Sequence, residues 1–114
     1  MRELSFRIWL EKEKRFYYFD IQDAATLLFI SSPMLKLKVD QSTGVYDKTG
    51  EKIYENDIVK FNNGIYSVEF CQKSCSFILR NNKQIWWLST NKGENIEIIT
   101  NIYEDMQLSF KIKV

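Results

Sequence analysis

Two carboxylates are the groups in this sequence whose types and spacing come closest to catalytic chemistry. Glu55 and Asp57 would lie about 7 Å apart on one face of a strand, where paired carboxylates could act as general acid and base. Nothing else in the sequence supports that pairing, and Asp57 comes just before a predicted strand. We therefore expect the Asp57 carboxylate to accept backbone N–H groups of a turn, which is a structural role.

Two cysteines are the next candidates. Cys71 and Cys75 have no histidine and no further cysteine in the chain to complete a metal site. In one strand they would lie about 13 Å apart, too far for a disulfide, although a tight turn could bring them together. We expect free thiols, buried or half-buried, and no metal site.

A basic and aromatic segment, residues 71–93, is the strongest candidate for binding. It contains no acidic residue, and its candidate binding residues are Lys73, Arg80, Lys83, Trp86, Trp87 and Lys92. Aromatic faces beside cations suit stacking on bases and pairing with phosphates. Adjacent tryptophans of a strand point to opposite faces, so one should enter the core and the other should be exposed or lie in an interface. A solvated strand pair, a protein or self-association surface, and a nucleic-acid surface all remain open.

The composition excludes several mechanisms. The 114-residue chain has no histidine, which removes Ser-His-Asp and Cys-His nucleophiles and histidine-ligated zinc. It also lacks a phosphate loop, a dinucleotide fingerprint and a nucleophile elbow. We predict a protein that is not an enzyme and that uses no cofactor.

The net charge of +1 hides an uneven distribution of charge. Segment 40–60 holds five acidic and three basic residues, and segment 94–114 holds four acidic and two basic residues. Opposite patches allow head-to-tail self-association, so we expect a second copy or another protein as partner. No apolar signal region begins the sequence, and the longest apolar run, 27–30, is too short to span a membrane. We expect a cytoplasmic protein without a membrane partner.

Short strands separated by Asn and Gly turns predict a mainly β protein, a small barrel or a rolled sheet. Residues 3–9 and 15–19 predict a hairpin, and Asp20 to Ser32 fits either a short helix or a strand. Residues 41–52 predict a loop, in which Gly44 and Gly50 supply positive φ angles. Further strands are expected over 35–39, 53–61, 65–70, 76–80, 84–88, 96–103 and 108–114, and Asn63-Gly64 should turn a hairpin. The expected core is Val45, Ile53, Ile58, Val59, Val68, Phe70, Phe77, Leu79, Ile98 and Ile102.

Three blocks, in this order, resemble the YopX family of phage and prophage proteins. The first runs from Arg2 to Trp9 with Tyr17-Tyr18-Phe19-Asp20 after it, the second from Thr43 to Val59, and the third is Asn101-Ile102-Tyr103-Glu104. The second block is the specific one, and its structural motif residues are Gly44, Asp47, Gly50, Tyr54 and Asp57. Asn56 stands where the family usually has Gly, and Asn tolerates the left-handed conformation. Thr100 replaces another usual Gly.

The resemblance implies an SH3-like barrel over residues 40–114, preceded by a β-rich segment over 1–39 with a hairpin and a possible short helix. It also implies a phage-encoded protein that acts inside the bacterial host. The family has no established enzymatic activity, so the resemblance implies no catalytic residue. We therefore predict a non-enzymatic interaction module that self-associates. Nucleic-acid binding through residues 71–93 is the alternative, and an enzyme using carboxylates or thiolates is the third hypothesis.

Overall fold

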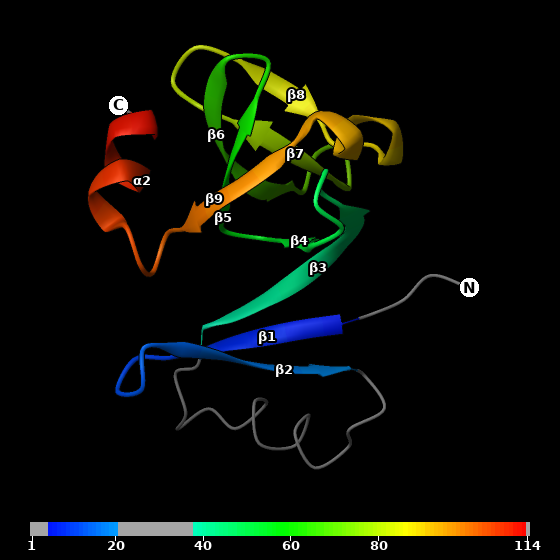
Figure 1. Cartoon of the computed structure of the whole chain (residues 1–114). Helices are drawn as coiled ribbons and strands as arrows, with labels where there is room; N and C mark the ends of the chain where they lie inside the picture. The colour runs from blue at the N-terminus through cyan, green and yellow to red at the C-terminus, as the bar shows by residue number, and fades with distance from the viewer. Residues whose placement is uncertain (1–4, 21–37, 114) are drawn as a thin grey trace.

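The computed structural model describes residues 5–20 and 38–113. In this part of the chain the strands form two antiparallel sheets, of order β2-β1-β3-β4 and β8-β7-β6-β5-β9, and the mainly β prediction is confirmed. Figure 1 shows the hairpin of β1 and β2 on one side, the curled second sheet on the other, and β3 and β4 between them. The expectation for Asp20 to Ser32 lies outside the described residues except for Asp20, which ends β2. Of the strand expected over 35–39, residues 35–37 lie outside them, and Val39 opens β3. None of the described helices is long and apolar enough to cross a membrane.

The first sheet begins with the predicted hairpin of β1 (Ser5–Leu10) and β2 (Arg15–Asp20). β3 (Val39–Tyr46) pairs with β1 through its first residues and with β4 (Lys52–Tyr54) through its later ones. The loop predicted over residues 41–52 is therefore wrong for residues 41–46, which belong to β3. Strand pairing on both sides outweighs the turn preference of this segment, and Gly44 lies with a φ of 79° at an irregularity of the ladder.

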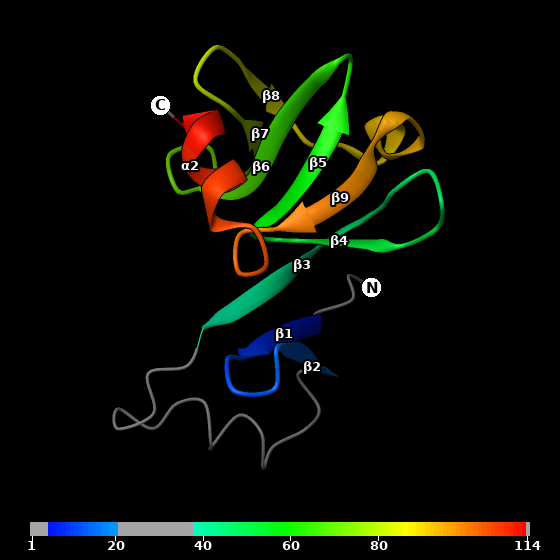
Figure 2. The same ribbon diagram turned by 60° about the vertical axis from the view of Figure 1, so that its left-hand side comes forward.

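The second sheet is the curled one (Figure 2). It comprises β5 (Asp57–Phe61), β6 (Gly64–Cys71), β7 (Ser76–Arg80), β8 (Ile85–Trp87) and β9 (Glu97–Asn101), with a 3₁₀ helix η1 (Thr90–Asn95) before β9. The hairpin expected near Asn63-Gly64 is confirmed. Its two turn residues are Asn62 and Asn63, whose φ angles of 48° and 63° are those of a type I′ turn, and Gly64 opens β6.

The main apolar cluster lies inside the curled sheet. Its buried residues are Val45, Ile53, Val59, Phe61, Tyr66, Val68, Leu79 and Ile96, with Trp86, Leu88 and Ile98 packed against them. Seven of the ten expected core residues are buried, whereas Ile98 and Ile102 are half-buried. Phe70 is 44% exposed, so its prediction is wrong. It lies one residue before the end of β6, next to the β6–β7 turn, where its ring packs edge-to-face on Phe77.

The C-terminal strand predicted over 108–114 is wrong, because Met106–Lys113 form the helix α2, which lies beside β6 (Figure 1). Asp105 caps this helix, since its Oδ1 accepts the N–H of Leu108 at 2.9 Å. In a series of apolar residues at alternate positions, every residue also has an apolar residue four positions away, which is the spacing of one helix face. Leu108 and Ile112 form such a pair, half-buried and buried, on one helix face, while Met106 and Phe110 are exposed.

Candidate functional site

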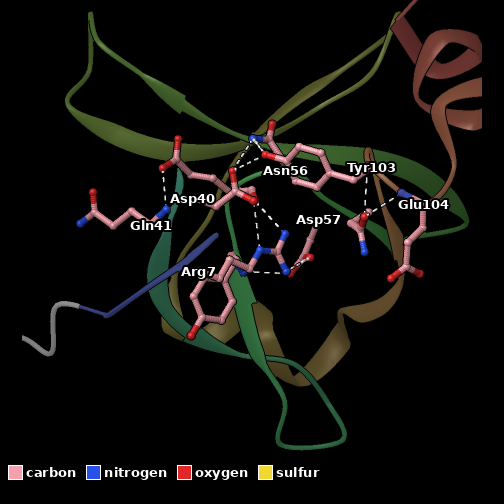
Figure 3. A network of polar contacts seen from close by, with 10 residues as sticks. Arg7, Asp40, Gln41, Asn56, Asp57, Tyr103 and Glu104 are labelled. Atoms are coloured by element: carbon pink, nitrogen blue, oxygen red, sulfur yellow. Dashed lines mark hydrogen bonds and ion pairs between the residues drawn. The ribbon is translucent and has the colours of Figure 1, made fainter. Parts of the chain in front are cut away.

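Arg7 of β1 lies at the junction of the two sheets and is almost completely buried (Figure 3). Its Nε donates to Asp40 Oδ2 at 3.0 Å, its Nη1 lies 2.8 Å from Asp57 Oδ1, and its Nη2 donates to the Glu55 carbonyl at 3.0 Å. The guanidinium also lies between two rings, 4.0 Å from the centre of Phe16 and 4.9 Å from that of Tyr54. One side chain thus joins β1, β3 and the start of β5.

Both carboxylates of this junction are fully engaged. The second oxygen of Asp40 accepts hydrogen bonds from Asn56 Nδ2 and from the Tyr103 hydroxyl, each at 2.7 Å (Figure 3). The second oxygen of Asp57 accepts the backbone N–H of Tyr54 at 2.8 Å. The predicted role of Asp57 as acceptor of a turn N–H is therefore confirmed, while its ion pair with Arg7 was not foreseen.

The junction holds two carboxylates and one guanidinium. Burial raises the pKa of Asp57 to about 6, although the positive charge of Arg7 and the Tyr54 N–H oppose this shift. Burial would lower the pKa of Arg7, but the two carboxylates outweigh it and raise that pKa. Burial and the hydrogen bond to Asp40 also raise the pKa of Tyr103. The junction thus carries one negative charge in excess when both carboxylates are ionised.

The turn between β3 and β4 is organised by Asp47. Its Oδ1 accepts the N–H groups of Thr49 and Glu51, each at 2.9 Å, and its Oδ2 accepts the N–H of Ile98 in β9 at 3.1 Å. Gly50 has a φ of 88°, so the positive φ predicted there is confirmed. This turn therefore ties the β3–β4 hairpin to the edge of the curled sheet.

A cleft of about 420 Å³ opens beside the junction. Arg7 and Asp57 lie at its base, and Phe16, Tyr18 and Tyr54 contribute aromatic rings. The remaining lining residues are Glu51, Lys52, Ile98, Thr100, Asn101 and Glu104. The cleft thus combines a buried ion pair with aromatic rings and exposed acidic side chains.

The basic residues predicted to bind do not share one surface. Lys73 and Lys83 lie exposed in the turns at opposite ends of β7. Arg80 lies 3.8 Å from Glu69, and the Lys92 ammonium donates to the Trp87 carbonyl and lies 5.6 Å from the Trp86 ring.

The two tryptophans do point to opposite faces, as predicted. Trp86 packs edge-to-face on Phe61, and its Nε1 donates to the Tyr66 hydroxyl at 3.0 Å. Trp87 is 67% exposed, and Ile85, two residues before it on the same face, is 60% exposed. Because Leu88 and Gln84 make the backbone hydrogen bonds to the neighbouring strand, the ladder turns the N–H and C=O of Ile85 and Trp87 away from β7. The outer edge of β8 is thus apolar and carries outward backbone groups.

The comparison with protein families agrees with this geometry. The family model described as YopX protein matches residues 9–108. The chain belongs to the YopX family. No curated protein matches it.

In this YopX-family protein, the three blocks that carry the resemblance meet at the junction. Arg7 comes from the first block, Tyr54 and Asp57 from the second, and Tyr103 from the third (Figure 3). Asn56 has a φ of 68°, so the left-handed turn survives without the family's usual Gly. Residues from all three blocks therefore help to join the two sheets of this chain.

Sequence reasoning missed Arg7, Asp40, Asn101 and Tyr103 as members of a site. Arg7 alternates with the apolar Phe6 and Ile8, and that pattern is typical of a side chain that faces solvent. The one signal that could have pointed to Arg7 was that it belongs to the first block of the resemblance, as Asp57 belongs to the second and Tyr103 to the third.

The cysteines are free, as predicted, but only Cys71 is half-buried, and Cys75 is exposed. Cys75 lies in the β6–β7 turn with a φ of 51°, where its Sγ donates to the Gln72 carbonyl. Within the described ranges, His, Cys, Asp and Glu form no group of three or more that could hold a metal ion.

Proposed function

We propose that this protein is a phage-encoded, non-enzymatic interaction module on an SH3-like scaffold, acting in the bacterial cytoplasm, and that it self-associates through the edge of β8. The observation that carries this proposal is the pair Ile85 and Trp87, which project from one face of an edge strand and are 60% and 67% exposed. Burying side chains of this size against a partner contributes about 1.5–3 kcal/mol each. Trp is also the residue type most enriched at the energetic centres of interfaces.

The backbone of β8 supports pairing with a second copy. Its outward N–H and C=O groups belong to Ile85 and Trp87 and repeat every second residue, as an added strand requires. An antiparallel pair centred on Trp86 would place Ile85 of one copy opposite Trp87 of the other, with their outward groups paired. Such a two-fold contact is closed and gives a dimer.

The state of the carboxylates supports a non-enzymatic role. Asp57 lines the cleft beside the junction and has a raised pKa, but its two oxygens are taken by Arg7 and by the Tyr54 N–H. Glu55 uses its side chain to accept the Gln41 N–H at 2.9 Å. Transfer of a substrate proton to Asp57 would remove its ion pair with Arg7 and so weaken the junction.

Sedimentation equilibrium from micromolar to millimolar concentration tests the proposal. We expect a monomer–dimer equilibrium in the natural protein and a monomer throughout in the Ile85→Thr/Trp87→Ser double variant. Phe110→Ser is the matched control, since Phe110 is 70% exposed on α2, away from β8 in both views, and should leave the dimer intact.

A natural protein that stays monomeric would overturn the proposal, as would a dimer that the double variant forms equally well. Salt-sensitive retention of single-stranded DNA, lost in Lys83→Glu, would replace it with the nucleic-acid function.

A further inference from the structure

We propose that the cleft between the β1–β2 hairpin and β9 binds an arginine or lysine side chain within an extended segment of a partner protein. This site is separate from the β8 edge and goes beyond the proposed self-association. Three independent features of its lining point to such a ligand: its charge, its aromatic rings and one buried amide.

The charge of the cleft favours a cation. Arg7 at its base is shared between Asp40 and Asp57, so its positive charge does not balance both carboxylates. Glu51 and Glu104, both exposed, add two acidic groups to the lining. Lys52 also lines the cleft and keeps its positive charge, since its ammonium donates to the neutral Ser5 hydroxyl at 3.1 Å. The two cations, Arg7 and Lys52, still stand against the four carboxylates of Asp40, Asp57, Glu51 and Glu104. A ligand cation would therefore meet an excess of negative charge next to a buried ion pair.

The aromatic rings suit the stem and the head of a basic side chain. The Tyr18 ring is 57% exposed and lies 5.6 Å from the Tyr54 ring, with Phe16 on the same side. Long basic side chains pack their methylene groups on such rings, and their charged ends are attracted to ring faces. The protein already holds its own guanidinium, that of Arg7, between Phe16 and Tyr54.

The side-chain amide of Asn101 can donate a hydrogen bond to a ligand in the cleft. Asn101 is only 7% exposed, and its Oδ1 accepts the N–H groups of Tyr103 and Glu104, each at 3.0 Å. These bonds fix the side chain of Asn101, which lines the cleft. Its Nδ2 has no hydrogen-bond partner among the residues that the structure describes. This nitrogen is not cut off from solvent, but a free cation would offer it no acceptor. A peptide segment supplies a backbone carbonyl for it beside the basic side chain.

Titration of the protein with N-acetyl-arginine N-methylamide, followed by ¹⁵N NMR, tests this site. We expect shifts of the Asn101 side-chain amide and of the β9 backbone amides. The uncharged isostere N-acetyl-citrulline N-methylamide should bind about tenfold more weakly, because it lacks the charge that the cleft selects. Affinity should also fall on acidification, as Asp57 becomes protonated.

Two variants keep the test independent of folding. Glu104→Gln removes an exposed charge at the rim and should weaken arginine binding severalfold, while Glu13→Gln, an exposed charge in the β1–β2 turn, should leave it unchanged. Equal binding of the two ligands, no shift at Asn101, or insensitivity to Glu104→Gln would each overturn the proposal. The Ile85→Thr/Trp87→Ser variant should bind the arginine ligand normally, so failure of one proposal leaves the other standing.

Discussion

Arg7 and Asp40 occupy directly opposed positions on β1 and β3, and their side chains form an ion pair of 3.0 Å with almost no exposure to solvent. Arg7 then reaches across to Asp57 at the start of β5. Of the described residues, those of β1 and β2 contribute nothing to the main apolar cluster. The hairpin is therefore held to the rest of the protein by the β1–β3 ladder, by buried charges and by stacked rings, and not through the main apolar cluster.

Removing Arg7 should loosen this junction. Arg7→Met leaves Asp40 and Asp57 buried without their counter-ion, and breaking a buried pair in this way costs about 3–5 kcal/mol. We expect the midpoint of urea unfolding, followed by circular dichroism, to fall accordingly.

The exposed arginine next in the hairpin provides the control. Arg15 pairs with Glu13 at 2.8 Å, but both side chains are more than half exposed. Arg15→Met should therefore change the free energy of unfolding by less than about 1 kcal/mol. Equal losses in the two variants would show that Arg7 contributes no more than a surface pair.

Local patterns in the sequence predicted the parts of the fold that depend on neighbouring residues. The β1–β2 hairpin and the turn after Phe61 were foreseen, because alternation and Asn-rich turns act over a few residues. The junction could not be foreseen in the same way. Arg7 becomes an inward residue only because Asp40 and Asp57 come from strands far along the chain.

The strand predicted over residues 108–114 was wrong for a different reason. The apolar residues Met106, Leu108, Phe110 and Ile112 stand at alternate positions, which fits a strand. Met106 and Phe110, and likewise Leu108 and Ile112, are also four residues apart, which fits one face of a helix. The cap from Asp105, and Lys111 and Lys113 in the last turn, favour the helix. Capping therefore decides the ambiguity that periodicity leaves open.

Stability should rise on mild acidification because of Asp57. Its pKa is raised from 3.8 to about 6 in the folded protein, so the folded state binds this proton more tightly than the unfolded state. That stabilising contribution is complete below the unfolded pKa and is lost as the pH rises through about 6. We expect the free energy of unfolding to be higher at about pH 5 than at about pH 7.5 by about 1.4 kcal/mol, roughly half of the full effect, which is reached only below the unfolded pKa.

The matched variant for this effect is Asp57→Asn, which should flatten the pH dependence across that window. Glu55, whose pKa burial also raises, contributes in the same direction. Asp47 acts the other way, since its hydrogen bonds outweigh the effect of burial and lower its pKa, but its contribution is lost only under more acidic conditions. A natural protein whose stability falls from neutral pH to about pH 5 would contradict the prediction.

Asn56 combines a left-handed backbone with a side chain that bonds to Asp40. Asn56→Gly keeps the backbone and loses the side-chain hydrogen bonds, whereas Asn56→Ala loses both. We expect the alanine variant to be less stable than the glycine variant by about 1 kcal/mol, measured by urea denaturation. Equal stability of the two would mean that the turn relaxes out of its positive φ.

Lys92 should limit the association that we propose for β8. Its ammonium donates to the Trp87 carbonyl, one of the backbone groups that an added strand would need. Lys92→Met keeps an unbranched side chain over Trp86, frees that carbonyl and removes a positive charge that two copies would bring together. We therefore expect a dissociation constant severalfold lower than that of the natural protein in sedimentation equilibrium. Lys73→Met, at the distant β6–β7 turn, removes the same charge without freeing the carbonyl and should leave association unchanged. Weaker association in the Lys92 variant would place the contact elsewhere than at the β8 edge.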